Sequence, residues 1–353
     1  MRFLAVTHQL TRTGAPVVLL SLIRLLISDG HSVDVISMED GTLSSDFTEL
    51  GITVTIQSTF ASDFVTSKDY DYVICNTVET RTAVMALNGS NIPVIWWSHE
   101  PRQWFETFYD ELPDPNTLQK NVKVLSVSPL TQDAYRDIYR YDTELFPFYV
   151  DDIAETILSN DTSSEKSAGR ITRFISIGLF SYMKAPDVLA AAIPGLSPKE
   201  LKSSEFIFCG DAEGSDPDFV DSVKQLEAAL PMVRLQPTLP HNELLSLLSS
   251  CDYLVVPSRF DPMPTVAAEA MMLSIPTILS DGCGISRFTS GNEGFTFISE
   301  SLSDLTTKLR RAIDFKRDRY AYRKMKEASR STYGLFFTKG IFLDNFYGFL
   351  NMG

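Results

Sequence analysis

The feature that most constrains this chain is a repeated alternation of short β-branched runs with helical stretches. Helical spacing of apolar residues covers Ala15–Ser28 and Thr131–Tyr139. Parallel strands need long crossovers, usually helices, so this alternation favours a parallel sheet covered on both faces. The runs typical of strands in the first part of the chain are Arg2–Thr7, Val33–Ser37, Thr53–Ile56, Tyr72–Cys75, Val94–Trp97 and Val124–Val127.

A second α/β series follows a polar stretch at 153–170, which we interpret as a loop because it carries too few apolar residues for a core. The chain has 353 residues, more than one core usually organises. We therefore predict two Rossmann-like doubly wound domains, residues 1–150 and 151–334. Expected strands are Arg173–Ile177, Phe206–Cys209, Val233–Leu235, Tyr253–Pro257 and Thr277–Ser280, and expected helices Pro186–Ala192, Asp218–Ala229, Asn242–Ser249 and Thr265–Leu273.

The last stretch, about 335–353, is aromatic on nearly all sides, which predicts a helix that packs back on the first domain. Doubly wound sheets bind ligands at the carboxyl ends of their strands, and two that face one another form a cleft. We expect the chemistry in that cleft.

Charge and hydropathy exclude several classes of protein. The net charge is −14, which argues against nucleic-acid binding, because that depends on clustered Lys and Arg. The longest apolar stretch, Val17–Ile27, is interrupted by Arg24 and is too short to span a bilayer. The first residues lack the features of a secretory signal, so we expect a cytoplasmic protein.

The spacing of the cysteines and a cluster of basic residues allow two further expectations. Cys75, Cys209, Cys251 and Cys283 are widely spaced, which favours free thiols over disulfides or a metal site. We predict no metal. Nine basic and two acidic residues gather between 308 and 326. This basic island is either a solvated helical face or a patch for anionic lipid or an acidic partner, which would place the protein peripherally at the inner face of the membrane.

The densest motif runs from Tyr253 to Met272, where a buried strand passes through a turn into a helix. Pro264 suits a first helical position, so the free amides of Thr265 and Val266 would form an anion site in the cleft. Asp261 in the preceding loop and Glu269 in the second helical turn would face different parts of one ligand. A loop Asp and a helix Glu without a ligand are the alternative.

In context, this segment resembles the E-x7-E signature of the retaining glycosyltransferases of family 4, which have the GT-B fold. The preceding Pro257-Ser258 and the later strand Thr277–Ser280 belong to the same pattern. The loop at 11–16, with Gly14 before the first helix, looks like the family's N-terminal glycine loop. The resemblance thus covers nearly the whole chain.

The resemblance implies roles for individual residues. His99 ends a strand where the family carries a histidine that approaches the donor sugar, and Lys184 matches the lysine that neutralises the departing diphosphate. Leu179 stands where the family has an arginine, and Arg259 could replace that cation. Asp261, an aspartate in place of the first family glutamate, would accept hydrogen bonds from the sugar, and Glu269 from the ribose. The nucleotide base would lie near Leu235-Gln236-Pro237.

The expected function is transfer of a sugar from a nucleoside diphosphate to a hydroxyl, with retention at the anomeric carbon. His99, Asp261 and Lys184 are the expected catalytic residues. Gly14, Lys184, Arg259, Thr265, Val266 and Glu269 are the expected residues for the nucleotide-sugar donor, which is a substrate, since no cofactor is expected. The acceptor would be a glycan, lipid-linked or glycoprotein hydroxyl in cell-surface glycan synthesis. An inactive glycan-binding partner subunit with the same fold, or an epimerase or phosphorylase, are the alternatives.

Overall fold

The computed structural model describes residues 1–60, 69–160, 171–211 and 214–350. The chain divides into two compact units, residues 1–148 with 343–353 and residues 149–342. This division lies close to the predicted boundary. It differs at the C-terminus, where residues 335–342 belong to unit 2 and only the remainder belongs to unit 1.

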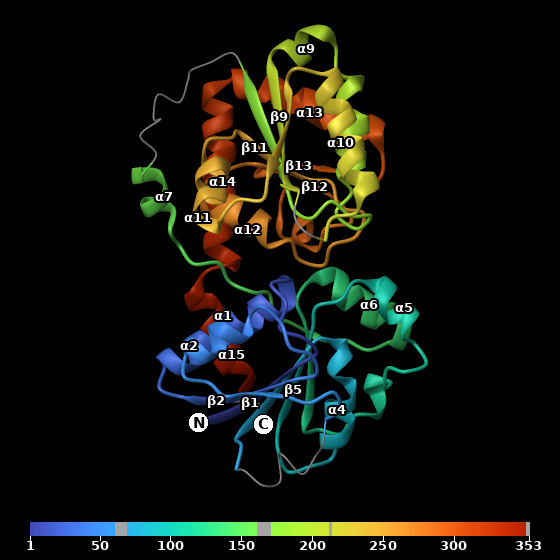
Figure 1. Cartoon of the computed structure of the whole chain (residues 1–353), viewed down its shortest axis with the longest axis vertical. Helices are drawn as coiled ribbons and strands as arrows, with labels where there is room; N and C mark the ends of the chain where they lie inside the picture. Colours follow the sequence, from blue (N-terminus) through green and yellow to red (C-terminus); the bar gives the residue numbers. More distant parts are fainter. Residues whose placement is uncertain (61–68, 161–170, 212–213, 351–353) are drawn as a thin grey trace. The chain divides into compact units, whose positions relative to one another are not determined.

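Unit 1 contains a parallel sheet of seven strands in the order β3-β2-β1-β4-β5-β6-β7 among its described residues. The strands are β1 Arg2–Thr7, β2 Ser32–Ser37, β3 Val54–Ile56, β4 Tyr72–Asn76, β5 Val94–Ser98, β6 Val122–Ser126 and β7 Glu144–Leu145. The described α-helices of unit 1 are α1 Gly14–Ser28, α2 Ser44–Glu49, α4 Arg81–Leu87, α5 Arg102–Thr107 and α6 Pro129–Tyr139. Figure 1 shows these helices beside the sheet.

The sheet of unit 1 is hydrophobic on both faces, as expected for parallel strands. Trp96 and Trp97 are fully buried, and their indole N–H groups donate to the carbonyls of Thr77 (2.9 Å) and Phe146 (2.9 Å). Both tryptophans are therefore satisfied core residues. Neither ring is free to stack on a ligand.

Helix α15, Lys339–Leu350, begins in unit 2 and continues into unit 1. Its Phe346 ring lies 6.0 Å from Phe146 and 6.1 Å from Phe3, and the Tyr347 hydroxyl lies 3.1 Å from Nε2 of His31. The predicted single helix from about 335 is instead two helices, because α14 ends at Phe336 and α15 starts at Lys339.

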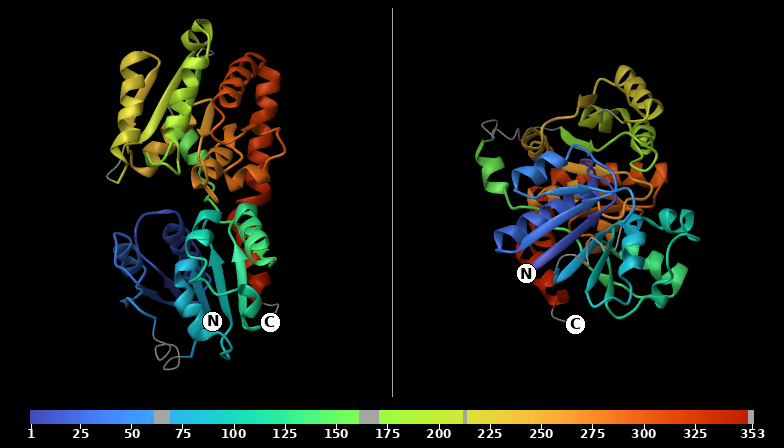
Figure 2. Two further views of the ribbon diagram at one scale, coloured as in Figure 1. Left: turned by 90° about the vertical axis from the view of Figure 1, so that its right-hand side faces the viewer. Right: turned by 60° about the horizontal axis from the view of Figure 1, so that its bottom comes forward.

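Among its described residues, unit 2 contains a parallel sheet of six strands in the order β10-β9-β8-β11-β12-β13. Figure 2 shows helices beside this sheet from two further directions. The strands are β8 Thr172–Ile177, β9 Ser204–Asp211, β10 Val233–Pro237, β11 Tyr253–Val256, β12 Thr277–Ser280 and β13 Gly294–Phe297. The helices are α7 Ala154–Asn160, α8 Pro186–Ala192, α9 Pro198–Lys202, α10 Pro217–Ala229, α11 His241–Ser249, α12 Thr265–Met272, α13 Leu302–Arg317 and α14 Arg319–Phe336.

The predicted loop at 153–170 was wrong for its first part, where α7 forms. The segment is polar, but Ile157 is buried at 4% exposure and supplies the apolar contact that the helix needs. The rest of that predicted loop, residues 161–170, lies outside the described residues.

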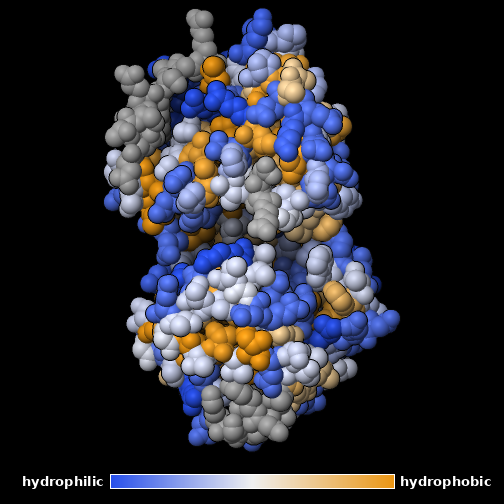
Figure 3. Space-filling view, in the orientation of Figure 1, coloured by the Kyte–Doolittle hydropathy of each residue, from blue (hydrophilic) through white to orange (hydrophobic). Residues whose placement is uncertain are grey.

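The strand segments that the sequence predicts lie in these two sheets. Both are doubly wound parallel sheets, so the predicted fold class, two Rossmann-like α/β domains, is confirmed. Within the described residues, no helix is long and apolar enough to cross a membrane. On the face drawn in Figure 3, hydrophilic and hydrophobic residues are interspersed on both units.

Candidate functional site

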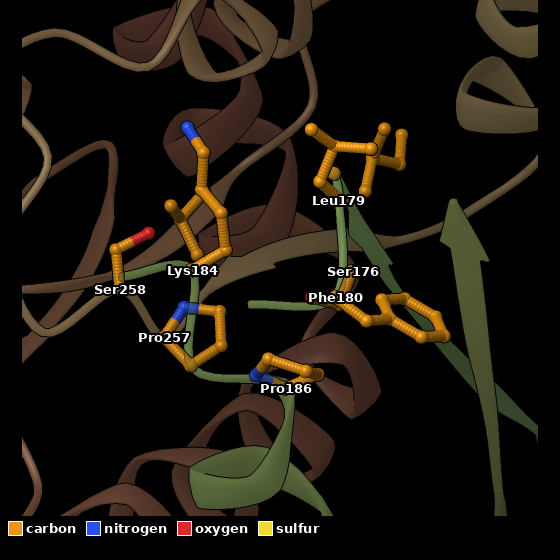
Figure 4. Close-up of a pocket in the computed structure, with 10 residues that line it drawn as sticks. Ser176, Leu179, Phe180, Lys184, Pro186, Pro257 and Ser258 are labelled. Carbon is orange, nitrogen blue, oxygen red and sulfur yellow. The ribbon is translucent and has the colours of Figure 1, made fainter. Parts of the chain in front are cut away.

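A pocket in unit 2 lies at the carboxyl ends of β8 and β11, two neighbouring strands (Figure 4). Its walls come from the loop after β8, the start of α8 and the turn after β11. They consist of Ser176, Ile177, Gly178, Leu179, Phe180, Lys184, Pro186, Val256, Pro257 and Ser258. Ligands of doubly wound sheets bind at this edge.

Lys184 and Asp261 form an ion pair at this pocket. Nζ of Lys184 lies 2.5 Å from Oδ2 of Asp261, and the Asp261 side chain is 7% exposed against 30% for Lys184. Burial acts to lower the pKa of Lys184, but the Asp261 carboxylate outweighs it and raises that pKa, so the ammonium stays charged. Oδ1 of Asp261 also accepts from the Met263 amide at 3.3 Å. The structure therefore brings together two of the predicted catalytic residues.

Ser258, which belongs to the family pattern but had no predicted role of its own, contributes a hydroxyl to the pocket wall. The residue is 1% exposed, and its Oγ has no hydrogen-bond partner among the described residues. A buried hydroxyl without a regular hydrogen bond is costly. The buried Cys283 thiol also interacts with this hydroxyl, which acts to lower the pKa of the thiol. In Figure 4, Ser258 lies on the same side of the pocket as Lys184, and Leu179 lies on the opposite side.

Leu179 places an apolar side chain on the pocket wall, where the family pattern has an arginine. It is 41% exposed. Lys184 is therefore the only cationic side chain that lines this pocket among the described residues. A diphosphate would meet one cation here instead of two.

Helix α12 presents its amino end without a side-chain cap. Pro264 is the N-cap residue, and the Ala267 amide bonds back to its carbonyl at 3.2 Å. The Thr265 and Val266 amides have no hydrogen-bond partner among the described residues, and both residues are partly exposed. Free amides at a helix start favour an anion, as the sequence predicts.

Arg259 does not present a free guanidinium. It binds both carboxylate oxygens of Asp187, at 3.0 and 2.6 Å, and Nε lies 2.7 Å from Oε1 of Glu300. It also donates to the Tyr182 carbonyl at 2.9 Å and lies over the Tyr182 ring at 4.3 Å. These carboxylates raise the pKa of Arg259. Its predicted role as a second phosphate ligand is therefore not supported by its contacts, since four of its five N–H donors already bond to these two carboxylates and to the Tyr182 carbonyl.

Glu269 lies on the second turn of α12, with its side chain 14% exposed. Its Oε1 is 2.8 Å from Nε2 of His241, the first residue of α11. The Glu269 carboxylate raises the pKa of His241, since it stabilises the imidazolium. His241 was not predicted from the sequence, and its place 28 residues before Glu269 gave no signal of the contact.

Gly210 and Gly282, which lie beside the loops of the site, are among the glycines that close backbone approach requires. A Cβ on Gly210, which has φ +141°, would lie 1.9 Å from the Gly178 carbonyl oxygen. A Cβ on Gly282 would lie 2.2 Å from the Arg259 carbonyl oxygen. Gly14 differs, because nothing lies within 4 Å of its ideal Cβ. Its predicted role in donor binding stays a prediction.

His99 lies in unit 1, directly after β5. Burial and the nearby His8 lower the pKa of His99 to about 3, so its ring is neutral. Its ring centroid is 4.4 Å from that of Trp97, and its Nε2 is buried with no described partner. The carboxylate of Glu100 accepts from the His99 amide at 2.8 Å, and burial raises the pKa of Glu100 to about 8. An orphaned nitrogen of this kind is available to a ligand.

Three other predictions concern the basic island, the cysteines and a metal. Most cations of the basic island on α13 and α14 are paired, for example Arg310 with Glu200 (2.9 Å) and Arg317 with Asp314 (2.7 Å). This pairing favours the solvated helical face over a lipid patch. All four cysteines are buried free thiols. In the described parts of the chain, no three His, Cys, Asp or Glu side chains gather as a metal site, and the absence of a metal stays a prediction.

Comparison with known families matches two models to the chain. A model described as Glycosyl-transferase family 4 covers residues 1–135, and one described as Glycosyl transferases group 1 covers residues 160–332. The chain belongs to glycosyltransferase family 4. The predicted family is thereby confirmed. The pocket of unit 2 lies within residues 160–332, and His99 lies within residues 1–135.

Curated relatives of this family 4 member are similar over part of their length. A glycogen synthase of Mycobacterium tuberculosis is 27% identical over 139 residues, which are 39% of this chain and 33% of the relative. A D-inositol 3-phosphate glycosyltransferase of Nocardioides is 28% identical over 166 residues, 43% of this chain and 36% of the relative. The similarity thus spans about a third of the length of these relatives.

Solved structures are similar over the whole of this glycosyltransferase. Anabaena HepE, crystallised with UDP and glucose, has a TM-score of 0.77 at 15% identity, and the match covers 99% of both chains. At this identity the likeness shows the GT-B fold alone, which agrees with the fold implied by the sequence.

Proposed function

We propose that this chain transfers a sugar from a nucleoside diphosphate, with UDP as the first candidate, to a hydroxyl of a glycan, glycolipid or glycoprotein. The observation that carries the proposal is the Lys184–Asp261 ion pair at the pocket of unit 2. A single fixed cation with a carboxylate beside it suits a donor that carries a diphosphate next to a hydroxyl-rich sugar. The HepE structures with UDP and with UDP-glucose support the choice of nucleotide.

Each part of the site has a place in this reaction. The Lys184 ammonium, the amides of Thr265 and Val266 and the Ser258 hydroxyl bind the diphosphate. The Asp261 carboxylate accepts hydrogen bonds from the donor sugar. The role that the resemblance implies for His99, in unit 1, stays a prediction. The Glu269 carboxylate accepts from the ribose hydroxyls.

The transfer requires only positioning and charge stabilisation. The bond from the anomeric carbon to the phosphate oxygen breaks, and the acceptor oxygen bonds to the same face of that carbon. The acceptor proton passes to the departing phosphate, so the products are a glycoside and a nucleoside diphosphate. Lys184 and the helix amides stabilise the negative charge that grows on the phosphate. Retention, a role in cell-surface polysaccharide synthesis and a cytoplasmic site of action stay predictions from the resemblance.

Calorimetric titration with UDP, GDP and dTDP, followed by their sugar conjugates, tests the proposal. Selective binding of one nucleotide is expected, and Lys184→Ala and Glu269→Ala should each weaken it about ten- to hundred-fold, the usual loss for a hydrogen bond to a charged group. Lys224→Ala and Glu49→Ala change exposed side chains of the same types and should leave the affinity unchanged. Absence of binding by folded protein would refute the donor site.

A second candidate is a partner subunit that recognises a glycan without transferring sugar. Leu179 favours it, because an apolar residue replaces a phosphate-binding cation in the pocket. Product formation from the bound nucleotide sugar distinguishes the two, because a partner subunit would bind the donor and leave it intact in every acceptor mixture.

A further inference from the structure

The contact between His241 and Glu269 joins two neighbouring helices of unit 2. His241 is the first residue of α11, Glu269 lies on the second turn of α12, and the two helices pack against one another (Figure 1). Nε2 of the imidazole is 2.8 Å from Oε1 of the carboxylate, a distance typical of a charge-assisted hydrogen bond. In the proposed reaction Glu269 binds the ribose hydroxyls, and His241 has no part.

The ring of this pair is open to solvent, and the carboxylate is largely covered. The His241 side chain is 62% exposed, against 14% for Glu269. In the described part of the chain, His241 is the only residue that hydrogen-bonds to the Glu269 side chain, and Oε2 of Glu269 has no partner. A ligand therefore meets one free carboxylate oxygen and one that already bonds to a ring.

The place of His241 in its helix does not explain a positive charge there. Pro240 is the N-cap residue of α11 and provides no side-chain cap, so His241 begins the first turn. The helix dipole disfavours a cation at this end. The hydrogen bond to Glu269 nevertheless raises the pKa of His241 above its ordinary value of 6.5, although burial acts to lower it. The charged ring thus depends on Glu269.

The other charged groups near the ring leave this dependence unchanged. Glu243 on α11 itself and Glu155 on α7, which packs against α11, are both exposed. Arg330 belongs to α14, which packs against α12, and it is paired with Asp152. Among these groups, only the Glu269 carboxylate contributes to the pKa of the ring. The protonation of the ring is therefore linked to one carboxylate.

Ribose hydroxyls and the charged ring would compete for that carboxylate. Two neighbouring hydroxyls are held best when they donate to both oxygens of a carboxylate whose charge is not shared. A charged His241 bonds to Oε1 and neutralises Glu269, so the hydroxyls gain less. A neutral ring with its proton on Nε2 still donates and keeps the carboxylate in place, but it leaves the negative charge to the ligand.

We propose that His241 is a positioning residue that sets how strongly the donor site selects ribose over 2′-deoxyribose, weakly while the ring is charged and strongly once it has lost its proton. His241 acts through Glu269 and does not itself touch the nucleotide. The proposal rests on the ribose role of Glu269 in the proposed function. It widens the substrate class, because a site with a charged ring accepts 2′-deoxyribonucleoside diphosphates as well as ribonucleoside diphosphates.

Calorimetric titration with UDP and with 2′-deoxy-UDP measures this selection. The two nucleotides share the base and the diphosphate, so the ratio of their dissociation constants reports the 2′-hydroxyl contact and cancels the titration of the phosphate. The ratio should be about threefold at pH 5.5 and about thirtyfold at pH 9, because a hydrogen bond to an uncompensated charge contributes more than one to a neutralised group.

Two variants bracket the wild-type protein. His241→Gln keeps a neutral N–H donor and should give the high ratio at every pH. His241→Lys keeps a positive charge and should give the low ratio at every pH. His31→Gln, which removes a histidine of unit 1 that bonds to Tyr347, should keep the wild-type pH profile. A purely structural role of His241 would weaken both nucleotides alike and leave the ratio unchanged.

NMR of the imidazole nitrogens gives a second readout on the full-length protein. The chain has four histidines, and His241→Gln assigns the signal. The pKa of His241 should be lower with UDP bound than with 2′-deoxy-UDP bound. Because coupling between two ligands is reciprocal, the factor between the two proton affinities should equal the factor by which the nucleotide ratio changes with pH.

The outcomes separate this proposal from the proposed function. If UDP binds but the ratio is the same at pH 5.5 and pH 9, or if His241→Gln and His241→Lys give equal ratios, the role of His241 is refuted and the donor site stands. Glu269→Gln should still bind UDP and lose the pH dependence of the ratio, and a wild-type profile in this variant would also refute the proposal. Absence of UDP binding at every pH would refute the donor site and the role of His241 together.

Discussion

Asp261 and Lys184 form an ion pair in which Oδ2 of the carboxylate lies 2.5 Å from Nζ of the ammonium. A diphosphate that binds Lys184 must therefore share the ammonium with a carboxylate of the same sign as itself. In the proposed reaction Asp261 would bind the sugar hydroxyls and Lys184 the phosphate, and the two contributions can be separated by substitution.

The substitution Asp261→Asn should separate the contribution of Asp261 from that of Lys184. Removal of the negative charge makes Lys184 more available, so the affinity for UDP should stay the same or rise a few-fold. The rate of sugar transfer should fall about ten- to hundred-fold, because a charged acceptor for the sugar is lost. Calorimetry with UDP and product assays with the UDP-sugar measure the two effects. Asp221→Asn, on an exposed face of α10, is the control. Equal losses in both assays would mean that Asp261 acts only by holding Lys184.

Leu179→Arg should strengthen donor binding. Leu179 is 41% exposed on the pocket wall, so a longer cationic side chain can reach into the pocket without a buried clash. An added charge-assisted hydrogen bond to the diphosphate predicts about a tenfold gain in UDP affinity. Leu179→Gln, similar in length but neutral, should give no comparable gain. A loss of affinity on Leu179→Arg would show that the apolar residue itself contacts the donor.

The sequence predicted the strands better than the contacts of the site. Short β-branched runs bounded by turns are a local signal, and the predicted strand Thr277–Ser280 coincides with β12. Gly210 could be a simple turn in the sequence, but its role depends on the backbone of Gly178, which directly follows the neighbouring strand β8. The helix α7 was missed because its stability comes from a buried contact of Ile157 and not from local composition.

Arg259 shows why the roles of site residues are harder to predict. Its motif placed it correctly beside the pocket, but its partners Asp187 and Glu300 lie 72 and 41 residues away in the chain. Which carboxylates satisfy a cation is decided by tertiary packing, and no spacing in the sequence records it. The same is true of His241, whose partner Glu269 belongs to the next helix.

His241→Gln should reduce stability only at low pH. The Glu269 carboxylate raises the pKa of His241 above its ordinary value of 6.5, so the charged ring is favoured in the folded chain. This stabilisation is fully present below pH 6.5 and disappears as the pH rises through the raised pKa. Thermal unfolding of the wild type and the variant should therefore differ at pH 5 to 6 and converge at pH 9. His31→Gln, which removes a histidine of unit 1, is the control. A difference that persists at pH 9 would point to packing and not to the ion pair.

The contacts of Arg259 predict that it acts on the donor through Lys184. Asp187 is in the first turn of α8, and the Arg259 amide and guanidinium bond to the carbonyls of Met183 (2.9 Å) and Tyr182 (2.9 Å), on the chain just before Lys184. Arg259 therefore holds the loop that presents the lysine. In a chain that keeps Lys184, Arg259→Gln should weaken UDP binding about tenfold.

The decisive measurement is a double-mutant cycle, with UDP affinity measured by calorimetry. If Arg259 acts only through Lys184, then Arg259→Gln should cause no further loss in the Lys184→Ala background. If the guanidinium touches the phosphate itself, the two losses should add. Arg234→Gln, at a side chain that is 70% exposed and paired with Glu205, should have no effect in either background. Asp187→Asn removes the bidentate partner and should reproduce the loss seen for Arg259→Gln, because it frees the same loop without changing any group that could reach the donor.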